Sequence, residues 1–280
     1  MMLKSLFWRI NFFLMNRRSA KIGRRLGNGV KSVIVDSKNG MLAVDPRDLE
    51  VGYKLRKFGS YGLDEIARIN ELITSSSNVL IVGAHIGSIV IPISNHCNKV
   101  VAIEANPNNY KLLETNLHLN KSENITIHNI AASSKKETIE FQMNVVNSGG
   151  SKRVPKNNEY MYRYDNPEII DVQAHSLDEY LDDENFDLVL IDIEGSEYFA
   201  MQGMEKILAK CNTLIIEFLP HHLENVAGVA VEEFLSLIPE QFTKLTIPSK
   251  NKTHPIDIGR AMLKQMYHHK EGDDGIIFTK

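Results

Sequence analysis

A short apolar run that ends in a glycine turn constrains the fold of this chain more than any other feature. Residues 79–82, Val-Leu-Ile-Val, lead directly into Gly83, and Gly87 follows. A second apolar run, residues 100–103, ends in Glu104, about twenty residues beyond Gly83. This order predicts a buried parallel strand, a tight turn into a helix, and a second strand tipped by a carboxylate.

That arrangement is typical of the adenosine-binding half of a Rossmann-like sheet. Glycine at the turn lets the backbone approach a ligand closely, and the carboxylate can accept hydrogen bonds from both hydroxyls of a ribose. We therefore expect an adenosine-containing ligand between Gly83 and Glu104. The alternative is purely structural, with the two glycines serving only the close packing of helix on strand.

Strand-like and helix-like segments alternate from residue 78 onward. Such alternation predicts an α/β fold with a Rossmann-like, doubly wound and mostly parallel sheet. The predicted strands cover residues 79–82, 100–104, 125–129, 188–192 and 213–218, with an added strand over 138–145 and a closing pair at 245–247 and 276–278. The predicted helices cover residues 87–95, 107–120, 196–209 and 229–238. The stretch between the closing strands is polar and contains Pro248, Pro255, His268 and His269.

Two further segments precede this sheet. Asn39-Gly40, between two β-rich runs, predicts a hairpin. The 280 residues suit one large α/β domain with appendages. We therefore divide the chain into a basic amphipathic helical segment at 1–30, a hairpin-and-helix lead-in at 31–75, and a ligand-binding domain at 76–280.

The first segment combines apolar residues at helical spacing with many basic ones. The apolar residues are Leu3, Leu6, Phe7, Ile10, Phe13 and Leu14, and the basic ones are Lys4, Arg9, Arg17, Arg18, Lys21, Arg24 and Arg25. The apolar run is too short and too polar for a spanning helix. Two interpretations stay open. Residues 1–25 lie on anionic lipid at the inner face of a membrane, or the helix packs on its own domain or on a second subunit of a homo-oligomer.

Charge and cysteine content narrow the class of protein. The net charge of −3 at pH 7 gives no reason to expect nucleic-acid binding by the whole chain. Cys97 and Cys211 do not make a disulfide framework, and no Cys-His cluster has zinc spacing. We therefore expect a protein of the reducing cytoplasm.

Loops after consecutive parallel strands meet at one crevice, where open α/β sheets bind ligands. Asp192 and Glu194 alternate at strand spacing there and point the same way. They can orient a substrate, share a proton or hold a divalent cation, or else serve only helix capping and structural hydrogen bonds. One of His221 and His222, after the last central strand, is a candidate general base, with an ordinary surface-loop histidine as the alternative.

Taken together, these motifs resemble the FkbM-type methyltransferases, class I enzymes that use S-adenosyl-L-methionine. The resemblance rests on Val-Leu-Ile-Val-Gly-Ala-His-Ile-Gly at 79–87, Ile-Glu-Ala-Asn-Pro at 103–107, Ser-Leu-Asp at 176–178 and Ile-Asp-Ile-Glu-Gly-Ser-Glu at 191–197. Val-Asp-Pro at 44–46 and Gly-Ser-Tyr-Gly at 59–62 resemble the family's lead-in. The third segment, 76–280, then becomes an S-adenosylmethionine-binding methyltransferase domain.

The resemblance implies methyl transfer to a hydroxyl of a sugar, polyketide or other small-molecule or glycan acceptor. Asp192 and Glu194 would face the transfer site, and Asp192 or His221 would take the hydroxyl proton. The cofactor would be held by three groups of residues: Gly83, Ala84, His85 and Gly87 on the methionine side, Glu104 on the ribose, and Ala105, Asn106, Asn129 and Ala131 around the adenine. The loop at 147–151 is a candidate acceptor-side element, with a mobile surface loop as the alternative.

The chain departs from the family pattern at three positions. Ile81 stands where the family usually has Asp, His85 where it has Asn, and Leu190 where it often has Lys. An Asp at position 81 would help to hold the methionine amino group, and Asp192 or a backbone carbonyl is a candidate substitute.

Two other functions compete with methyl transfer. A nicotinamide dehydrogenase normally shows Gly-x-Gly-x-x-Gly, and the third glycine is missing here. A non-catalytic module that binds partners or membrane through its basic start is the second rival.

Overall fold

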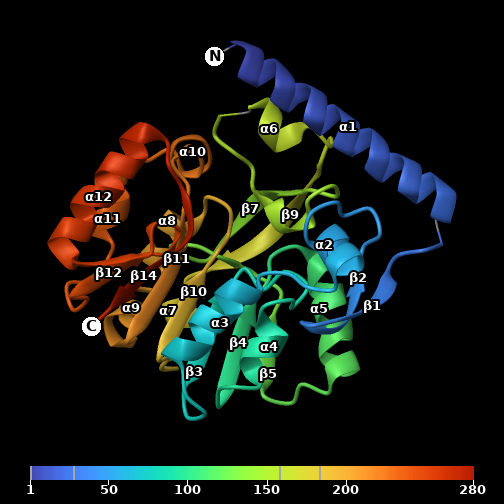
Figure 1. Cartoon of the computed structure of the whole chain (residues 1–280). Coiled ribbons are helices and arrows are strands. Elements are labelled where there is room, and N and C mark those ends of the chain that lie inside the picture. The colour runs from blue at the N-terminus through green and yellow to red at the C-terminus, as the bar shows by residue number, and fades with distance from the viewer. Residues whose placement is uncertain (1, 28, 158, 183) are drawn as a thin grey trace.

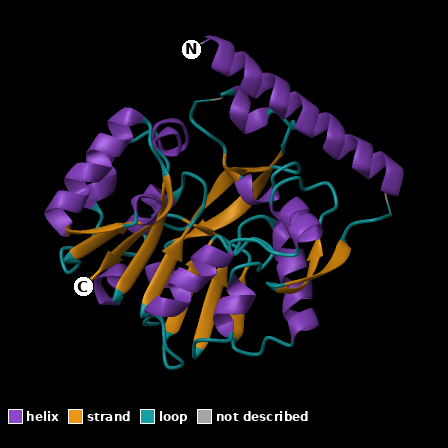
Figure 2. Cartoon of the chain, viewed as in Figure 1, coloured by secondary structure: helices purple, strands orange, loops and turns teal. Residues whose placement is uncertain are grey.

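The computed structural model describes residues 2–27, 29–157, 159–182 and 184–280, with the side chains of residues 2–7 left out. It contains an eight-stranded sheet, a four-stranded sheet, a two-stranded hairpin and a long N-terminal helix (Figures 1 and 2). Among the described helices, none is both long and apolar enough to cross a bilayer.

The eight-stranded sheet confirms the predicted α/β, Rossmann-like fold. Its order is β13-β12-β14-β11-β10-β3-β4-β5. The strands are β3 (Asn78–Val82), β4 (Lys99–Ile103), β5 (Ile125–His128), β10 (Leu188–Ile191), β11 (Thr213–Phe218), β12 (Lys244–Ile247), β13 (Lys252–Pro255) and β14 (Asp273–Thr279). β5, β4, β3, β10 and β11 are parallel, and β14 runs antiparallel between β11 and β12. The chain order reverses between β3 and β10, which opens a crevice at their carboxyl ends.

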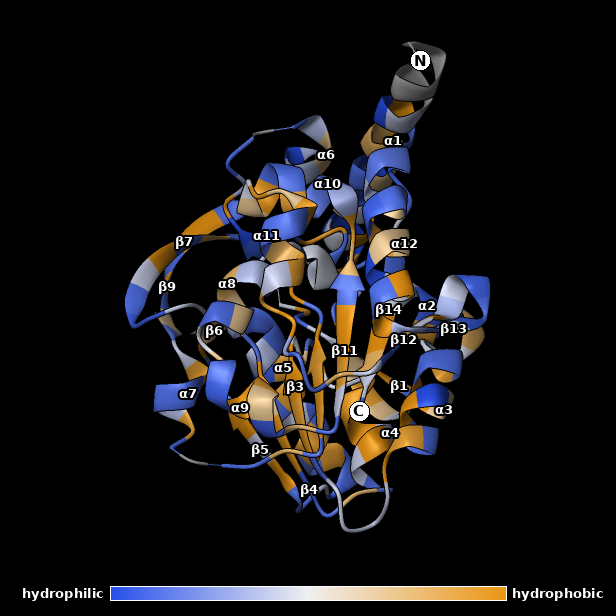
Figure 3. Ribbon diagram, turned by 90° about the vertical axis from the view of Figure 1, so that its left-hand side faces the viewer, coloured by the Kyte–Doolittle hydropathy of each residue, from blue (hydrophilic) through white to orange (hydrophobic). Residues whose placement is uncertain are grey.

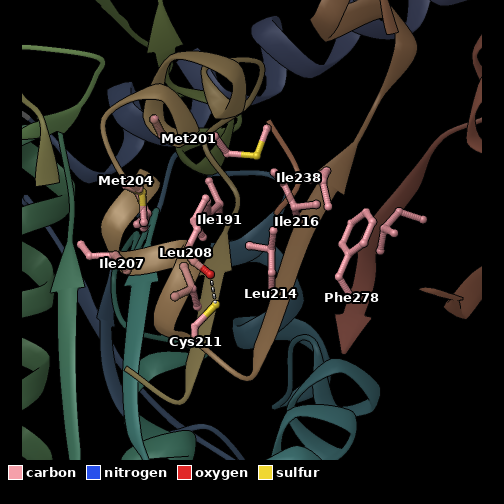
Figure 4. Close-up of a cluster of buried hydrophobic side chains, with 14 of the residues drawn as sticks. Ile191, Met201, Met204, Ile207, Leu208, Cys211, Leu214, Ile216, Ile238 and Phe278 are labelled. Carbon is pink, nitrogen blue, oxygen red and sulfur yellow. Dashed lines mark hydrogen bonds between the residues drawn. The ribbon is translucent and has the colours of Figure 1, made fainter. Parts of the chain in front are cut away.

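Both faces of this sheet are buried, which explains why its strands are continuous apolar runs. One face carries Leu80, Ile191 and Ile216 and is covered by α8 (Glu197–Gln202), α9 (Glu205–Lys210), α11 (Val231–Ser236) and α12 (Ile256–His269). Figure 4 shows Met201, Met204 and Leu208 against this face. The other face carries Ile81 and Leu190 and is covered by α3 (Leu63–Leu72), α4 (Val90–Ser94) and α5 (Pro107–Asn120).

A second sheet of four strands has the order β6-β9-β7-β8. Its strands are β6 (Ala131–Ala132), β7 (Glu137–Met143), β8 (Lys152–Arg153) and β9 (Glu168–His175). The strand predicted over 138–145 corresponds to β7, but β9 was not predicted. Residues 170–174 of β9 alternate between inward Ile170, Val172 and Ala174 and exposed Asp171 and Gln173, so a strand signal was present and was missed. The strand pairs with β7 along nearly its whole length.

The lead-in contains the predicted hairpin, β1 (Val33–Ser37) and β2 (Gly40–Val44), followed by α2 (Val51–Phe58). The N-terminal helix α1 (Met2–Leu26) lies across α2 and α6 (Tyr160–Arg163) on the outside of the molecule (Figure 1). The remaining short helices are α7 (Leu177–Tyr180) and α10 (Pro220–His222). The predicted boundary at residue 75 falls in the loop before β3, and the division into domains stays a prediction.

Two helix predictions were wrong for tertiary reasons. The helix predicted over 196–209 is interrupted at Gly203, where a Cβ would lie 2.0 Å from the carbonyl oxygen of Ser133. The interruption lets the chain pass close to β6. In the polar stretch between the closing strands, where no helix was predicted, the structure has α12, whose Gly259 lies so close to β12 that a Cβ would come within 2.7 Å of Leu245. A glycine that reads as a loop signal here serves close packing.

Candidate active site

The glycine turn after β3 is pressed against the loop after β10. The backbone amides of Gly83 and Ala84 both donate to the carbonyl oxygen of Ile103 at 2.9 Å. Gly83 has φ +102°, and a Cβ there would lie 1.8 Å from the carbonyl oxygen of Asp192. Only glycine fits this position. Gly87 serves packing instead, because a Cβ there would come within 2.7 Å of Leu113 on α5.

Glu104 at the tip of β4 is buried and points back at the turn. Its two carboxylate oxygens accept from the amides of His85 and Asn106, each at 2.7 Å. Desolvation raises its pKa to about 7 against these hydrogen bonds. Each oxygen keeps a second lone pair, so the carboxylate can still accept from two ligand hydroxyls.

A cavity with about 560 Å³ of empty space, its open mouth included, lies beside Glu104. Five predicted cofactor residues line it: Gly83, His85, Glu104, Ala105 and Ala131. Ile130 and, from β7, Ile139 and Phe141 add apolar walls. These β7 residues were not among the predicted site residues, because the pattern over 138–145 predicted a strand but not where that strand packs. The mixture of apolar walls and a few polar groups, with Glu104 among them, suits a nucleoside.

Asn106 and Asn129 hold the loop after β4 rather than line the cavity. Asn106 Oδ1 accepts from the amide of Asn108 at 2.9 Å, which caps α5. Asn106 Nδ2 donates to Ser151 Oγ at 3.0 Å. Asn129 Nδ2 donates to the carbonyl oxygen of Glu104 at 2.8 Å. Both asparagines therefore support the cofactor loop from behind.

A second cavity, with about 790 Å³ of empty space including its mouth, meets the first. The two share Gly83, His85, Gly149 and Asp192 as lining residues. The second cavity adds two predicted residues, Ala84 and Glu194, together with Lys54, Tyr61, Glu65 and Ile81. A ligand can therefore extend from one cavity into the other past the glycine turn.

His85 is tied to Ser148, which lies in the candidate loop at 147–151, and through it to Asp48, which was not among the predicted site residues. Ser148 Oγ donates to Asp48 Oδ2 in a short hydrogen bond and lies 2.7 Å from His85 Nε2. Desolvation lowers the pKa of His85 to about 4, so the ring is neutral at pH 7. Because the serine hydrogen is committed to Asp48, Nε2 carries the ring hydrogen and Nδ1 keeps a lone pair.

Asp192 lines both cavities, and its side chain is exposed to them. Desolvation, and then the neighbouring Glu194, raise its pKa well above the usual range. Its carboxylate accepts no hydrogen bond from the residues that the structure describes. It is therefore free to contact a ligand.

Glu194 belongs to a buried polar cluster centred on Lys152. Lys152 Nζ donates to Glu194 Oε2 at 2.9 Å and lies 3.3 Å from His222 Nε2. His222 Nδ1 lies 3.2 Å from Glu217 Oε2. Desolvation lowers the pKa of His222 well below its usual value, so a neutral ring donates to Glu217 and accepts from Lys152.

The same cluster contains three candidate ligands for a metal ion. Ligand atoms of Glu194, Glu217 and His222 lie within 4.8 Å of one another, as a metal site requires. The ammonium group of Lys152 lies against two of the three, so this lysine already supplies a positive charge there. A divalent metal in this protein stays a prediction.

The structure separates the two histidines after β11. His221 Nδ1 lies 3.1 Å from the hydroxyl of Tyr162, and His221 lines neither cavity. His222 faces Glu194, with Nε2 3.4 Å from its carboxylate. The sequence favoured His221, and nothing in the order of the two residues indicated which one turns inward.

Glu197 shapes the loop that presents Asp192 and Glu194. Its buried carboxylate accepts from the amides of Ile193 and Gly195, both at 2.9 Å. Glu194 is held at φ +57° and Gly195 at φ +102°. Desolvation raises the pKa of Glu197 to about 7. This supporting carboxylate was also missed, although it follows the Asp-x-Glu-Gly element directly.

These buried carboxyls predict an unusual pH dependence of stability. Glu104 and Glu197 have folded pKa values of about 7 against 4.5 for the usual glutamate. A raised folded pKa contributes stability that is lost as pH rises through it. From pH 6.5 to pH 8 the pair should therefore lower the free energy of unfolding of the ligand-free protein by about 1.5 kcal/mol.

Urea denaturation at the two pH values measures this difference. His85 and His222, whose folded pKa values are lowered, change the free energy of unfolding in the opposite direction, because the unfolded histidines lose their protons over the same window. The test is therefore the difference between wild type and Glu104→Gln, which should lose about 0.8 kcal/mol less between the two pH values because one of the two carboxyls is gone. An equal pH dependence of the two proteins would contradict the prediction.

The family model of the methyltransferase FkbM domain matches residues 82–244, more than half of the chain. The chain belongs to the FkbM methyltransferase family. The matched region contains the glycine turn, Glu104 and the Asp192 loop, and the resemblance seen in the motifs is confirmed. No curated protein matches the chain significantly.

Solved structures related to the FkbM chain are distant. An FkbM methyltransferase from Methylobacillus flagellatus is 16% identical with a TM-score of 0.45, over 74% of this chain and 44% of that one. Trm5b from Pyrococcus abyssi is 13% identical with a TM-score of 0.45, over 90% and 57%. The M. jannaschii tRNA m1G37 methyltransferase is 17% identical with a TM-score of 0.44, over 90% and 58%. The chain spans about half the length of these structures.

Proposed function

We propose that this FkbM protein transfers a methyl group from S-adenosyl-L-methionine to a hydroxyl of a small-molecule or glycan acceptor. The observation that carries the proposal is the pair of cavities that meet at Gly83 and Asp192. The first suits a nucleoside beside Glu104, and the second leaves room for an amino-acid end and an acceptor. Cys97 and Cys211 are both free and buried, in keeping with a reducing, cytoplasmic setting.

The residues present fit this cofactor. A Cβ would fill the cradle at Gly83, and Glu104 keeps acceptor capacity for two ribose hydroxyls. When bound, S-adenosylmethionine supplies a methyl group on a sulfonium, which is already a strong electrophile. The protein is left with two tasks, which are to align the acceptor hydroxyl and to take its proton.

Asp192 is our first candidate for taking the proton. It lies at the junction of the cavities, and its raised pKa makes it a stronger base than an ordinary aspartate. Lys152 neutralises the adjacent Glu194 at 2.9 Å, so the acceptor side does not carry two uncompensated charges. His222 orients Lys152 from behind, and His221 stays a weaker candidate because it contacts Tyr162.

Glu65 is a candidate for the role of the aspartate that the family usually has at position 81, where this chain has Ile81. Ile81 is buried on the face of the sheet that α3 covers, in the same apolar cluster as Ile69. Glu65 lies one turn before Ile69 and lines the second cavity with Ile81 and Asp192. Desolvation raises its pKa to about 7, and it accepts no hydrogen bond from the described residues. We propose that Glu65 holds the cofactor's amino group in place of the missing aspartate.

Calorimetry tests both the binding of the cofactor and the proposed role of Glu65. Wild type should bind both S-adenosylmethionine and 5′-methylthioadenosine, which lacks the amino-acid end, and should not bind NADH. Glu65→Gln should weaken S-adenosylmethionine roughly tenfold to a hundredfold, the value of a hydrogen bond to a charged group. Its affinity for 5′-methylthioadenosine should not change.

Glu71→Gln, an exposed position on the same helix, is the matched control and should bind like wild type. Equal losses for both ligands in Glu65→Gln would remove Glu65 from the amino-acid site. If the wild type bound neither S-adenosylmethionine nor 5′-methylthioadenosine, the methyltransferase proposal would be overturned.

A non-catalytic binding module is the second candidate, favoured by the apolar Ile81. Incubation of cell extracts with the protein and S-adenosylmethionine distinguishes the two. A methyltransferase should yield a metabolite heavier by one methylene in the mass spectrum. Cofactor binding without any such product would favour the non-catalytic alternative.

A further inference from the structure

The N-terminal helix α1 is held to the body of the protein by one of its faces. Phe12 stacks on Tyr164 with ring centroids 4.4 Å apart, and Asn16 Nδ2 donates to the carbonyl oxygen of Tyr164 at 3.0 Å. Ser19 is buried, and its Oγ donates to the carbonyl oxygen of Arg47 at 2.8 Å. This face therefore packs on the helix's own domain, one of the two interpretations that the sequence left open.

The opposite, outer face of α1 has no partner among the described residues except within the helix. Ile10, Phe13 and Leu14 lie one turn apart and are 51%, 54% and 56% exposed. The same face continues with exposed basic residues, Arg17, Lys21, Arg24 and Arg25. Figure 3 shows both hydrophilic and hydrophobic residues along the coloured part of α1. The predicted apolar residues Leu3, Leu6 and Phe7 lie outside the described side chains.

Charge is divided unevenly between α1 and the rest of the chain. The helix contains seven basic residues and no acidic one. The whole chain has a net charge of −3, which leaves −10 for the remainder. The electrostatic field of a protein with this charge distribution orients it so that α1 approaches a negatively charged surface first.

We propose that the outer face of α1 binds the surface of an anionic lipid bilayer. Ile10, Phe13 and Leu14 would enter the boundary between headgroups and acyl chains, as apolar residues of interfacial helices do. Arg17 and Lys21 have aliphatic stems that reach along the helix while their charges meet lipid phosphates. The apolar residues and the basic residues of the outer face of α1 thus contribute to the same contact with the bilayer.

A second copy of the chain fits this face less well. An isologous contact would bring two helices with seven positive charges each together, and like charges in contact are unfavourable. Anionic lipid compensates the same charges.

Docking through this face would bring the acceptor side of the site close to the bilayer. A small cavity with about 250 Å³ of empty space is lined by Tyr164, on which α1 packs, and by Lys152 and Asn147. Asn147 also lines the second cavity of the candidate active site. The proposal itself rests on α1 alone and does not depend on methyl transfer.

Co-sedimentation with vesicles gives a direct readout on the full-length protein. Vesicles that contain phosphatidylglycerol should bind the protein, and vesicles of phosphatidylcholine alone should not. Added salt should weaken the binding.

Two double variants test the apolar and the basic residues of the outer face separately. Phe13→Ser with Leu14→Ser, and separately Arg17→Gln with Lys21→Gln, should each weaken binding to the anionic vesicles at least tenfold. None of these four side chains packs on the body, so the fold should survive. The matched controls are Ile169→Ser with Ile258→Ser, about as exposed on β9 and α12, and Lys111→Gln with Lys135→Gln. Both controls should bind like wild type.

Three results would overturn the proposal. One is the absence of wild-type binding to anionic vesicles at low salt. Another is an equal loss of binding in the control variants. The third is a wild-type dimer in sedimentation velocity that becomes a monomer in Phe13→Ser with Leu14→Ser, which would assign the face to a second copy.

Discussion

Asp192→Asn should lower methyl transfer by about 100-fold or more while the fold and the cofactor affinity survive, because it removes the proposed proton acceptor. The side chain keeps its size but loses its basicity. Because ionised Asp192 is disfavoured by desolvation and by Glu194, the neutral asparagine should leave the protein at least as stable as wild type.

The measurement is the yield of the methylated metabolite in extracts supplied with S-adenosylmethionine, together with calorimetry of the cofactor. Asp257→Asn, exposed on α12, is the matched control and should behave as wild type. Unchanged activity would remove Asp192 from the mechanism. Loss of cofactor affinity instead would assign Asp192 to holding the cofactor, not to taking the proton.

Gly83→Ala should destabilise the protein by about 2–5 kcal/mol and abolish cofactor binding. The new Cβ would lie 1.8 Å from the carbonyl oxygen of Asp192, so the turn and the loop after β10 must separate. Overpacking of this kind costs about 1–3 kcal/mol, and a residue with a side chain at positive φ costs about 1–2 kcal/mol more.

Chemical denaturation and calorimetry measure the two effects. Gly149→Ala is the matched control, because it lines the same cavities but has no atom closer than 3.6 Å to its added Cβ. Its stability should stay close to that of wild type. A Gly83→Ala variant with wild-type stability and cofactor affinity would show that the turn can open without cost.

The parts of the fold that depend on neighbouring residues were predictable. The apolar run before Gly83 and the carboxylate at Glu104 predicted β3, β4 and the turn between them. Pro107 at the first turn predicted α5, whose bounds, Pro107–Asn120, match the prediction. β11, Thr213–Phe218, also matches. Signals of this kind work because strand alternation, helix starts and glycine turns are decided within a few residues.

The sequence by itself therefore determined the parallel sheet, the glycine turn after β3 and the family. Only the tertiary structure decided which polar groups complete the site. Ser148 meets Asp48 from 100 positions away, and Lys152 meets His222 from 70 away. Glu65 on α3 lines the same cavity as Gly83, which follows β3. Such pairs have no local pattern, because they exist only once the second sheet and the lead-in close over the carboxyl ends of the central strands.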